Sequence, residues 1–140
     1  AERRATYDKL NANAHSDDVQ YIMLGCPHYT LEQIANAARL LDGKRVSANT
    51  QLWIFTNRTF KLMADSKGYT RILENAGAVV MTDTCSAMST AVPKGTRTAA
   101  TDSAKQTHYL PAIVGVDSWF GSTEDCVDAA LSGKWRGVAP

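Results

Sequence analysis

Three cysteines, Cys26, Cys85 and Cys126, carry the most reactive side chains of this 140-residue chain. As thiolates they can ligate a metal ion or an inorganic cluster. Cys26 and Cys85 are 59 positions apart (85 − 26), and Cys85 and Cys126 are 41 apart (126 − 85). No Cys-x-x-Cys pair occurs, which argues against a zinc ribbon and against a thioredoxin-type redox site. Only folding can therefore bring these sulfurs together.

Each cysteine has a functional and a structural interpretation. Cys26 lies in Gly25-Cys26-Pro27-His28, just before a helix predicted to open at Thr30, whose unpaired N–H groups and positive end would favour a thiolate. The alternative is a structural thiol beside a turn-forming Gly and Pro. Cys85 lies in a segment too polar for a core, whereas Cys126 falls near the apolar side of the last predicted helix, where a packed core cysteine is common.

Several polar residues follow predicted strands and could bind an anion. Thr101 and Ser103 offer hydroxyl and N–H donors, and Lys105 a cation, for a carboxylate or phosphate. Asn57 and Arg58 follow another strand, and Arg58 could clamp a carboxylate with two hydrogen bonds. The alternatives are a capped helix start with a solvated lysine and a surface arginine in a first helical turn.

The pattern of apolar residues predicts strands alternating with helices. A polar N-terminal segment, 1–18, reads as a helix. Later helices begin near Thr30, Asn57, either Asp102 or Ser103, and Ser122, with a pause at Gly68 and a stop at Pro111. Apolar or β-branched runs predict strands at Val19–Leu24, Leu52–Phe55, Ala78–Met81 and Thr96–Ala100, with an extended run from Ile113 to Phe120.

This alternation predicts an α/β fold: three layers, with a mostly parallel, Rossmann-like sheet of four to five strands flanked by helices. We expect one domain over residues 1–140, itself a portion of a larger subunit. Because parallel strands end on one edge of a sheet, the polar and sulfur-bearing motifs should meet there, around one crevice.

Composition excludes several classes of protein. The chain is 44% hydrophobic and 21% charged, with a net charge of +1 and no basic stripe, so nucleic acid is not an expected partner. No apolar run approaches membrane-spanning length and no signal peptide precedes the first strand. An odd number of cysteines does not suit a secreted disulfide scaffold, so we expect a reducing, cytoplasmic setting.

Four motifs, in order, resemble a known family. They are Gly-Cys-Pro-His-Tyr-Thr-Leu-Glu-Gln from Gly25, Asp-Thr-Cys from Asp83, Thr-Asp-Ser-Ala-Lys-Gln-Thr-His-Tyr-Leu-Pro from Thr101 and Phe-Gly-Ser-Thr-Glu-Asp-Cys from Phe120. From about Val19 to about Trp135 the chain resembles the C-terminal part of the catalytic (large) subunit of the aconitase X family. It departs at Asp102, where Asn is more usual.

The resemblance implies an aconitase-type domain of an iron–sulfur-dependent hydro-lyase. Such enzymes remove water from small hydroxy acids, for example cis-3-hydroxyproline or 5-phosphomevalonate. It also implies that Cys26, Cys85 and Cys126 are the ligands of the cluster, either 2Fe-2S or 4Fe-4S. Three thiolates leave one iron open to act as a Lewis acid on the substrate.

Dehydration also requires cationic groups that hold the substrate carboxylate and a group that removes the neighbouring proton, which gives further residues candidate roles. Lys105, Ser103 and His28 are the catalytic candidates. The substrate-binding candidates are Arg58, Asn57, Thr101 and Tyr109.

The family's catalytic subunit is longer than this chain, and a swivelling small domain or subunit supplies its proposed serine base. We therefore expect the chain to need both the remaining catalytic portion and that domain, and to be inactive alone. Two alternatives remain: a mononuclear zinc or iron centre using Cys26, His28, Cys85 and Cys126, and a non-catalytic Rossmann-like anion-binding module.

Overall fold

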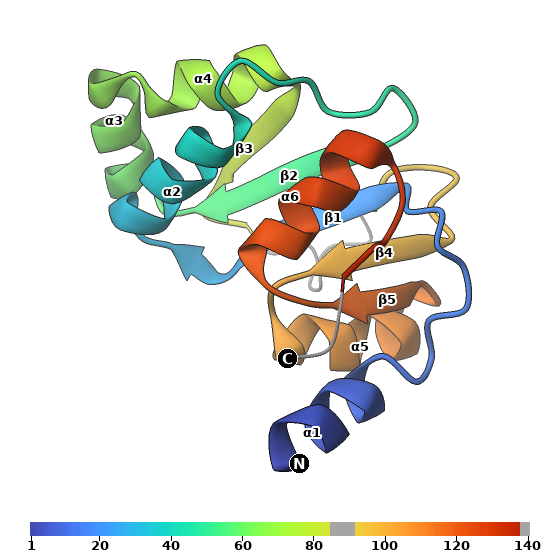
Figure 1. Cartoon of the computed structure of the whole chain (residues 1–140). Coiled ribbons are helices and arrows are strands. Elements are labelled where there is room, and N and C mark those ends of the chain that lie inside the picture. The colour runs from blue at the N-terminus through green and yellow to red at the C-terminus, as the bar shows by residue number, and fades with distance from the viewer. Residues whose placement is uncertain (85–91, 138–140) are drawn as a thin grey trace.

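The computed structural model describes residues 1–84 and 92–137, and within them five strands form one sheet. The strand order is β3-β2-β1-β4-β5, and every neighbouring pair is parallel (Figure 1). The expected α/β fold with a parallel sheet is thereby confirmed. The order reverses between β1 and β4, which is where open α/β sheets bind ligands. The strands are β1 Tyr21–Tyr29, β2 Gln51–Thr56, β3 Ala78–Thr82, β4 Thr98–Thr101 and β5 Asp117–Phe120.

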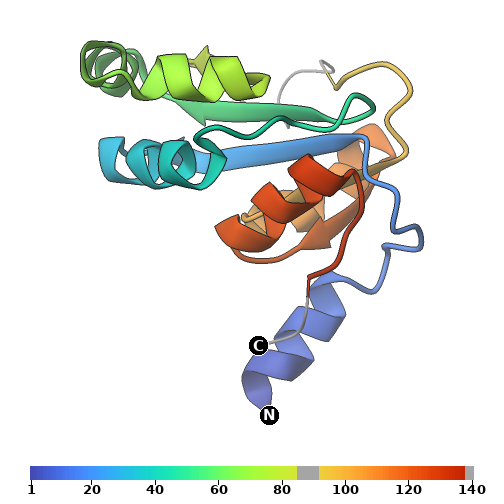
Figure 2. The ribbon, with the colours of Figure 1, turned by 45° about the horizontal axis from the view of Figure 1, so that its top comes forward.

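Helices cover both faces of this sheet, giving three layers. Helices α2, α3, α4 and α6 pack together on one face, whereas α5 lies on the other (Figures 1 and 2). Helix α1 contacts α5 and β5, and the amide of Asn11 after its end pairs with the backbone of Phe120 at 3.2 and 2.6 Å. The helices are α1 Glu2–Leu10, α2 Leu31–Leu41, α3 Arg58–Lys67, α4 Tyr69–Ala76, α5 Ala104–Val114 and α6 Thr123–Ser132.

The larger hydrophobic core lies under the four-helix face. Helix α2 contributes Ile34, Ala38 and Leu41 at helical spacing, and all three are buried. They pack with strand residues such as Leu24 and Ile54. A smaller core on the opposite face joins the strands to α5 and is built from Tyr21, Met23, Phe55, Ala99, Leu110 and Val116.

Strand β1 is interrupted where its sequence changes from apolar to polar. Leu24 pairs with Ile54 and Tyr29 with Thr56, so β1 advances five residues while β2 advances two. Gly25 permits this bulge, because its φ is +107° and a Cβ there would lie 2.2 Å from the carbonyl oxygen of Phe55. The segment from Cys26 to His28 is therefore pushed out of the ladder while remaining inside the strand.

Four expectations about element bounds were wrong. Strand β1 continues to Tyr29, because pairing resumes beyond the bulge. Helix α1 occupies only residues 2–10 of the expected 1–18. Helix α5 passes through Pro111 to Val114, with buried Leu110 anchoring it, and ends at Gly115 in the left-handed conformation. Strand β5 consequently begins at Asp117 rather than Ile113. The expected break at Gly68 and cap at Ser122 are confirmed.

Across residues 1–84 and 92–137, none of the helices combines the length and the apolar character needed to span a bilayer.

Candidate functional site

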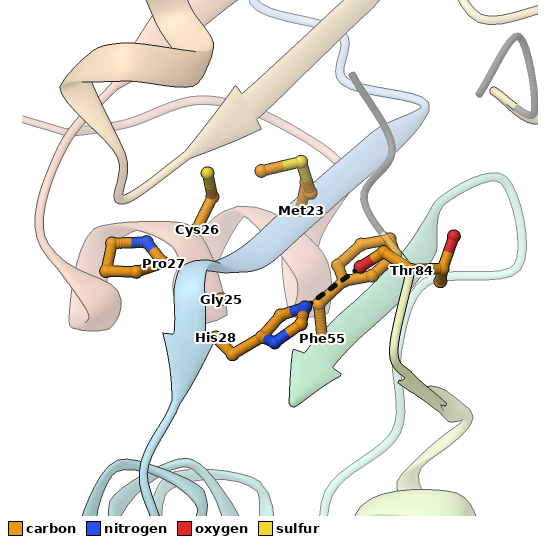
Figure 3. A pocket seen from close by; sticks show the side chains of 7 residues that line it. All are labelled: Met23, Gly25, Cys26, Pro27, His28, Phe55 and Thr84. Carbon is orange, nitrogen blue, oxygen red and sulfur yellow. Dashed lines mark hydrogen bonds between the residues drawn. The ribbon is translucent and has the colours of Figure 1, made fainter. Parts of the chain in front are cut away.

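The bulge in β1 opens a cavity of about 220 Å³ at the carboxyl edge of the sheet. Cys26 and His28, both singled out from the sequence, lie on its wall. The sulfurs of Cys26 and Met23 lie on the same side of β1, and His28 reaches across toward Thr84 (Figure 3). The full lining is Met23, Gly25, Cys26, Pro27, His28, Phe55 and Thr84.

The half-buried thiol of Cys26 is held by one amide. The side-chain Nε2 of Gln106, on α5, donates a hydrogen bond to its sulfur at 3.0 Å. Helix α2 begins at Leu31 after the expected N-cap Thr30, and Cys26 lies four positions before that cap, within β1. The expectation that the N-terminus of α2 polarises Cys26 stays a prediction. The positive partner at this sulfur is an amide N–H.

His28 links β1 to the segment that follows β3. Its Nε2 lies 3.0 Å from the carbonyl oxygen of Thr84, and since a carbonyl only accepts, Nε2 carries the proton. Cys85 is the next residue in sequence and lies outside the described residues. The predicted meeting of Cys26 and Cys85 therefore stays a prediction.

Cys126 lies in different surroundings from Cys26. It is fully buried in α6 within the larger core, whereas Cys26 packs against the smaller core on the opposite face. Burial raises the pKa of the Cys126 thiol well above its usual value, and the nearby carboxylate of Asp102 raises that pKa further. In this arrangement Cys126 is a protonated thiol.

Asp102 accepts two side-chain hydrogen bonds in a cluster that sequence reasoning missed. The hydroxyl of Tyr29 donates to its Oδ2, and Thr123 Oγ1 donates to the same oxygen at 2.9 Å. Burial, then the charge of Asp102, raises the pKa of Tyr29. These residues come from β1, the β4–α5 junction and α6, so no local pattern indicates their contact.

The two residues after β2 have structural partners. Asn57 caps α3, with its side-chain oxygen accepting from the backbone N–H of Phe60 at 2.8 Å. The exposed guanidinium of Arg58 pairs with Asp83 at 3.2 Å, across the ends of β2 and β3. Neither residue lines the cavity beside Cys26.

Replacing Asn57 with alanine should therefore lower the free energy of unfolding by about 1 kcal/mol, because the first turn of α3 loses its cap. Urea unfolding followed by circular dichroism measures this loss. Asn57→Asp is the matched control, since an aspartate oxygen can accept the same hydrogen bond. Equal losses in both variants would show that capping is not the role of Asn57.

The anion-binding candidates after β4 divide into buried and exposed residues. Thr101 and Ser103 are buried, and Ser103 caps α5 by accepting from the backbone N–H of Gln106 at 3.3 Å. Lys105 and Tyr109 are exposed on α5. All four lie at or beyond the carboxyl end of β4, but none lines the cavity at Cys26.

The side chains available as ligands fit a metal or cluster site bound by thiolates only in part. Cys26 has a cavity and an N–H donor at its sulfur, both of which favour a ligating thiolate. Cys126 is protonated, so a metal centre would have to displace its proton. Within 1–84 and 92–137, no three His, Cys, Asp or Glu side chains form a group able to hold a metal ion. A complete thiolate set therefore needs Cys85.

Comparison with known proteins agrees with the sequence motifs. Residues 19–132 match the family described as aconitase X third domain. The phosphomevalonate dehydratase large subunit of Methanocaldococcus jannaschii is 37% identical over 124 residues, covering 89% of this chain and 30% of that protein. The cis-3-hydroxy-L-proline dehydratase of Pseudomonas aeruginosa is 36% identical over 118 residues, covering 83% of this chain and 20% of that protein.

The fold is also similar to a crystal structure. The holo-form of Thermococcus kodakaraensis aconitase X superposes with a TM-score of 0.78 at 28% identity, covering 91% of this chain and 32% of that one. This chain thus spans about a third or less of each of these relatives. The extent of the match and the shared fold place the chain in the aconitase X family, as its third domain.

Proposed function

We propose that this chain is part of an iron–sulfur-dependent hydro-lyase that removes water from a small hydroxy acid. Its relatives named above are dehydratases. The observation that carries the proposal is Cys26, presented in a cavity at the carboxyl edge with a buried amide donating to its sulfur. Cys26, Cys85 and Cys126 would hold the cluster, and the free thiols of Cys26 and Cys126 suit a reducing cytoplasm.

A cluster held by three thiolates supplies a Lewis-acidic iron for the hydroxyl that leaves. The chain's own residues would bind and orient the acid. Arg58 pairs with Asp83 in an exposed ion pair, and such pairs contribute little stability, so its guanidinium can exchange this partner for a substrate carboxylate. Lys105 offers a second exposed cation. Asn57, Thr101 and Tyr109 remain candidates for further substrate contacts.

Proton transfer would involve residues at the strand ends. A neutral His28 with its proton on Nε2, toward Thr84, has Nδ1 as the acceptor nitrogen. Ser103 is buried at the start of α5, where its hydroxyl accepts one hydrogen bond and can donate another. We propose His28, Ser103 and Lys105 as the catalytic candidates on this chain.

The remainder of the site would come from other polypeptide. Relatives carry this domain in a longer subunit, of which the chain spans 30% in the Methanocaldococcus protein. We propose that the remaining catalytic portion and a swivelling small domain complete the enzyme, and that the 140-residue chain alone does not dehydrate cis-3-hydroxyproline or 5-phosphomevalonate. Turnover of either substrate by the isolated, reconstituted chain would contradict this.

Serine substitution at each cysteine tests ligation directly. After anaerobic reconstitution, Cys26→Ser, Cys85→Ser and Cys126→Ser should each lower iron and acid-labile sulfide content more than about 10-fold, beyond the effect typical of losing an outer-shell partner. Visible absorption and elemental analysis measure this loss. Ala129→Ser is the control for Cys126→Ser, because it places a hydroxyl in the same buried face of α6 without removing a thiol.

Three results would contradict the cluster. Unchanged iron content in Cys126→Ser would remove that residue from the ligand set. A colourless protein with one tightly bound zinc would favour a mononuclear site. A chain that takes up neither metal would favour an anion-binding module.

A further inference from the structure

Three helices of this fold open with the same sequence pattern, a hydroxyl residue followed three positions later by Gln or Asp. At α2 the pattern forms a full capping box: Thr30 accepts from the backbone of Gln33, and the Gln33 side chain accepts from the backbone N–H of Thr30 at 2.9 Å. Ser122 and Asp125 do the same at α6. This reciprocal arrangement is the usual use of such a pair.

Helix α5 departs from this arrangement at Gln106. Ser103 caps the backbone N–H of Gln106 as expected, but the Gln106 side chain does not return to Ser103. Its amide instead donates to the sulfur of Cys26, 80 positions away in sequence. The backbone N–H of Ser103 donates to Thr101 Oγ1 at 3.1 Å, so it is satisfied without the glutamine.

The departure places a polar side chain in the protein interior. Gln106 is only 1% exposed, and burying an amide is costly unless it is hydrogen-bonded. Burial also fixes the amide, so its N–H keeps one direction relative to the sulfur. The neighbouring capping boxes show that this sequence pattern also serves a helix start with both side chains bonded locally.

We propose that Gln106 is a positioning residue for Cys26. Its N–H fixes the direction of the sulfur lone pairs and stabilises negative charge on the sulfur. Hydrogen bonds to cluster sulfurs are among the factors that set reduction potential, and a donor favours the more negative, reduced state. The inference depends on the proposed function, since it assumes that Cys26 ligates the cluster.

The test compares Gln106→Leu and Gln106→Glu with the unaltered chain after reconstitution. Gln106→Leu should shift the cluster's reduction potential to a lower value, because the sulfur loses its hydrogen-bond donor. Gln106→Glu should keep most of the potential, because a buried carboxyl group beside a thiolate stays protonated and can donate through its O–H. Gln106→Leu should also weaken binding of Co²⁺ by the metal-free chain about 10-fold, as loss of an outer-shell partner does. Gln33→Leu is the matched control: it removes glutamine from the same helix position but should leave the potential and the Co²⁺ affinity unchanged.

A second measurement needs no metal. Alkylation of Cys26 by iodoacetamide at fixed pH, followed by peptide mass spectrometry, should be about 3- to 10-fold slower in Gln106→Leu, the range for one lost hydrogen bond. Unchanged alkylation, or an unchanged potential, in folded Gln106→Leu would overturn the role of Gln106. If Cys26→Ser keeps full cluster content, the proposed function fails instead, and the alkylation rate still decides whether Gln106 acts on the sulfur.

Discussion

Replacing Gly25 with alanine should lower the free energy of unfolding by on the order of 3 kcal/mol or more, at or above the upper end of the usual range for single substitutions. Two causes combine at this position. The backbone is in a conformation with φ of +107°, and an added Cβ would lie 2.2 Å from the carbonyl oxygen and 2.9 Å from the nitrogen of Phe55. Because both contacts are with backbone atoms of β2, the strands would have to separate.

Gly43→Ala separates these two causes. Gly43 also has a positive φ, +74°, but a Cβ there meets nothing within 4 Å, so only the conformational cost of about 1 kcal/mol applies. Urea unfolding of both variants, followed by tryptophan fluorescence and circular dichroism, measures the difference. Similar losses at the two positions would mean that the close approach of β1 and β2 is not what requires Gly25.

The substitution Gly25→Ala should also disturb the cavity lined by Cys26 and His28. The bulge that begins at this glycine presents Cys26 and His28 to the cavity. If β1 paired with β2 in a regular register, without the bulge, successive side chains would point to alternate faces of the sheet, and Cys26 and His28 would both be redirected. Gly25→Ala should therefore lower cluster content even at temperatures where the variant remains folded.

Raising the pH of the metal-free chain above about 9 should destabilise it by about 1.4 kcal/mol per pH unit through Cys126 alone. The pKa of this thiol is well above its ordinary value of 9.0 in the folded chain, because burial and Asp102 disfavour the thiolate. Below pH 9 both states keep the proton and stability is unaffected. Above it the unfolded chain releases the proton while the folded chain retains it, so stability is lost.

Tyr29 adds a second loss at higher pH. Its pKa is raised above the ordinary value of 10.0, again by burial first and then by Asp102. Above pH 10 the two groups together should contribute a slope of about 2.8 kcal/mol per pH unit, one proton from each.

Urea unfolding between pH 8 and 10.5 tests both contributions. Cys126→Ala should reduce the slope between pH 9 and 10 by about 1.4 kcal/mol per pH unit, and Tyr29→Phe should reduce it by the same amount only above pH 10. A slope that neither substitution changes would show that other groups govern the alkaline loss.

Asp102 connects this pH dependence to the chemistry. Among the charges that raise the pKa of Cys126 it is the strongest, ahead of Asp125 and Glu124. An asparagine here would keep an oxygen for Tyr29 and Thr123 without the negative charge. The negative charge of Asp102 therefore acts on the Cys126 thiol as well as on any anion bound nearby.

Local patterns predicted most of the fold, because helices and strands depend on neighbours in sequence. The spacing of Ile34, Ala38 and Leu41 indicated a helix with one buried face, and Thr30, Asn57 and Ser122 marked helix starts that the structure confirms. The alternation of strands and helices also predicted a parallel sheet, since parallel strands require crossover connections. Element bounds were less accurate at Pro111, where packing of Leu110 keeps the helix intact.

The sequence by itself also determined the family, through four motifs whose residues must occur in order. The surroundings of those residues depended on tertiary structure. A bulge in β1, rather than a helix start, positions Cys26, and a glutamine with the spacing of a helix cap donates to its sulfur instead. Asp102 meets Tyr29 and lies close to Cys126 only because β1, β4 and α6 converge at one edge. Register and long-range hydrogen bonds join distant segments, so no local pattern encodes them.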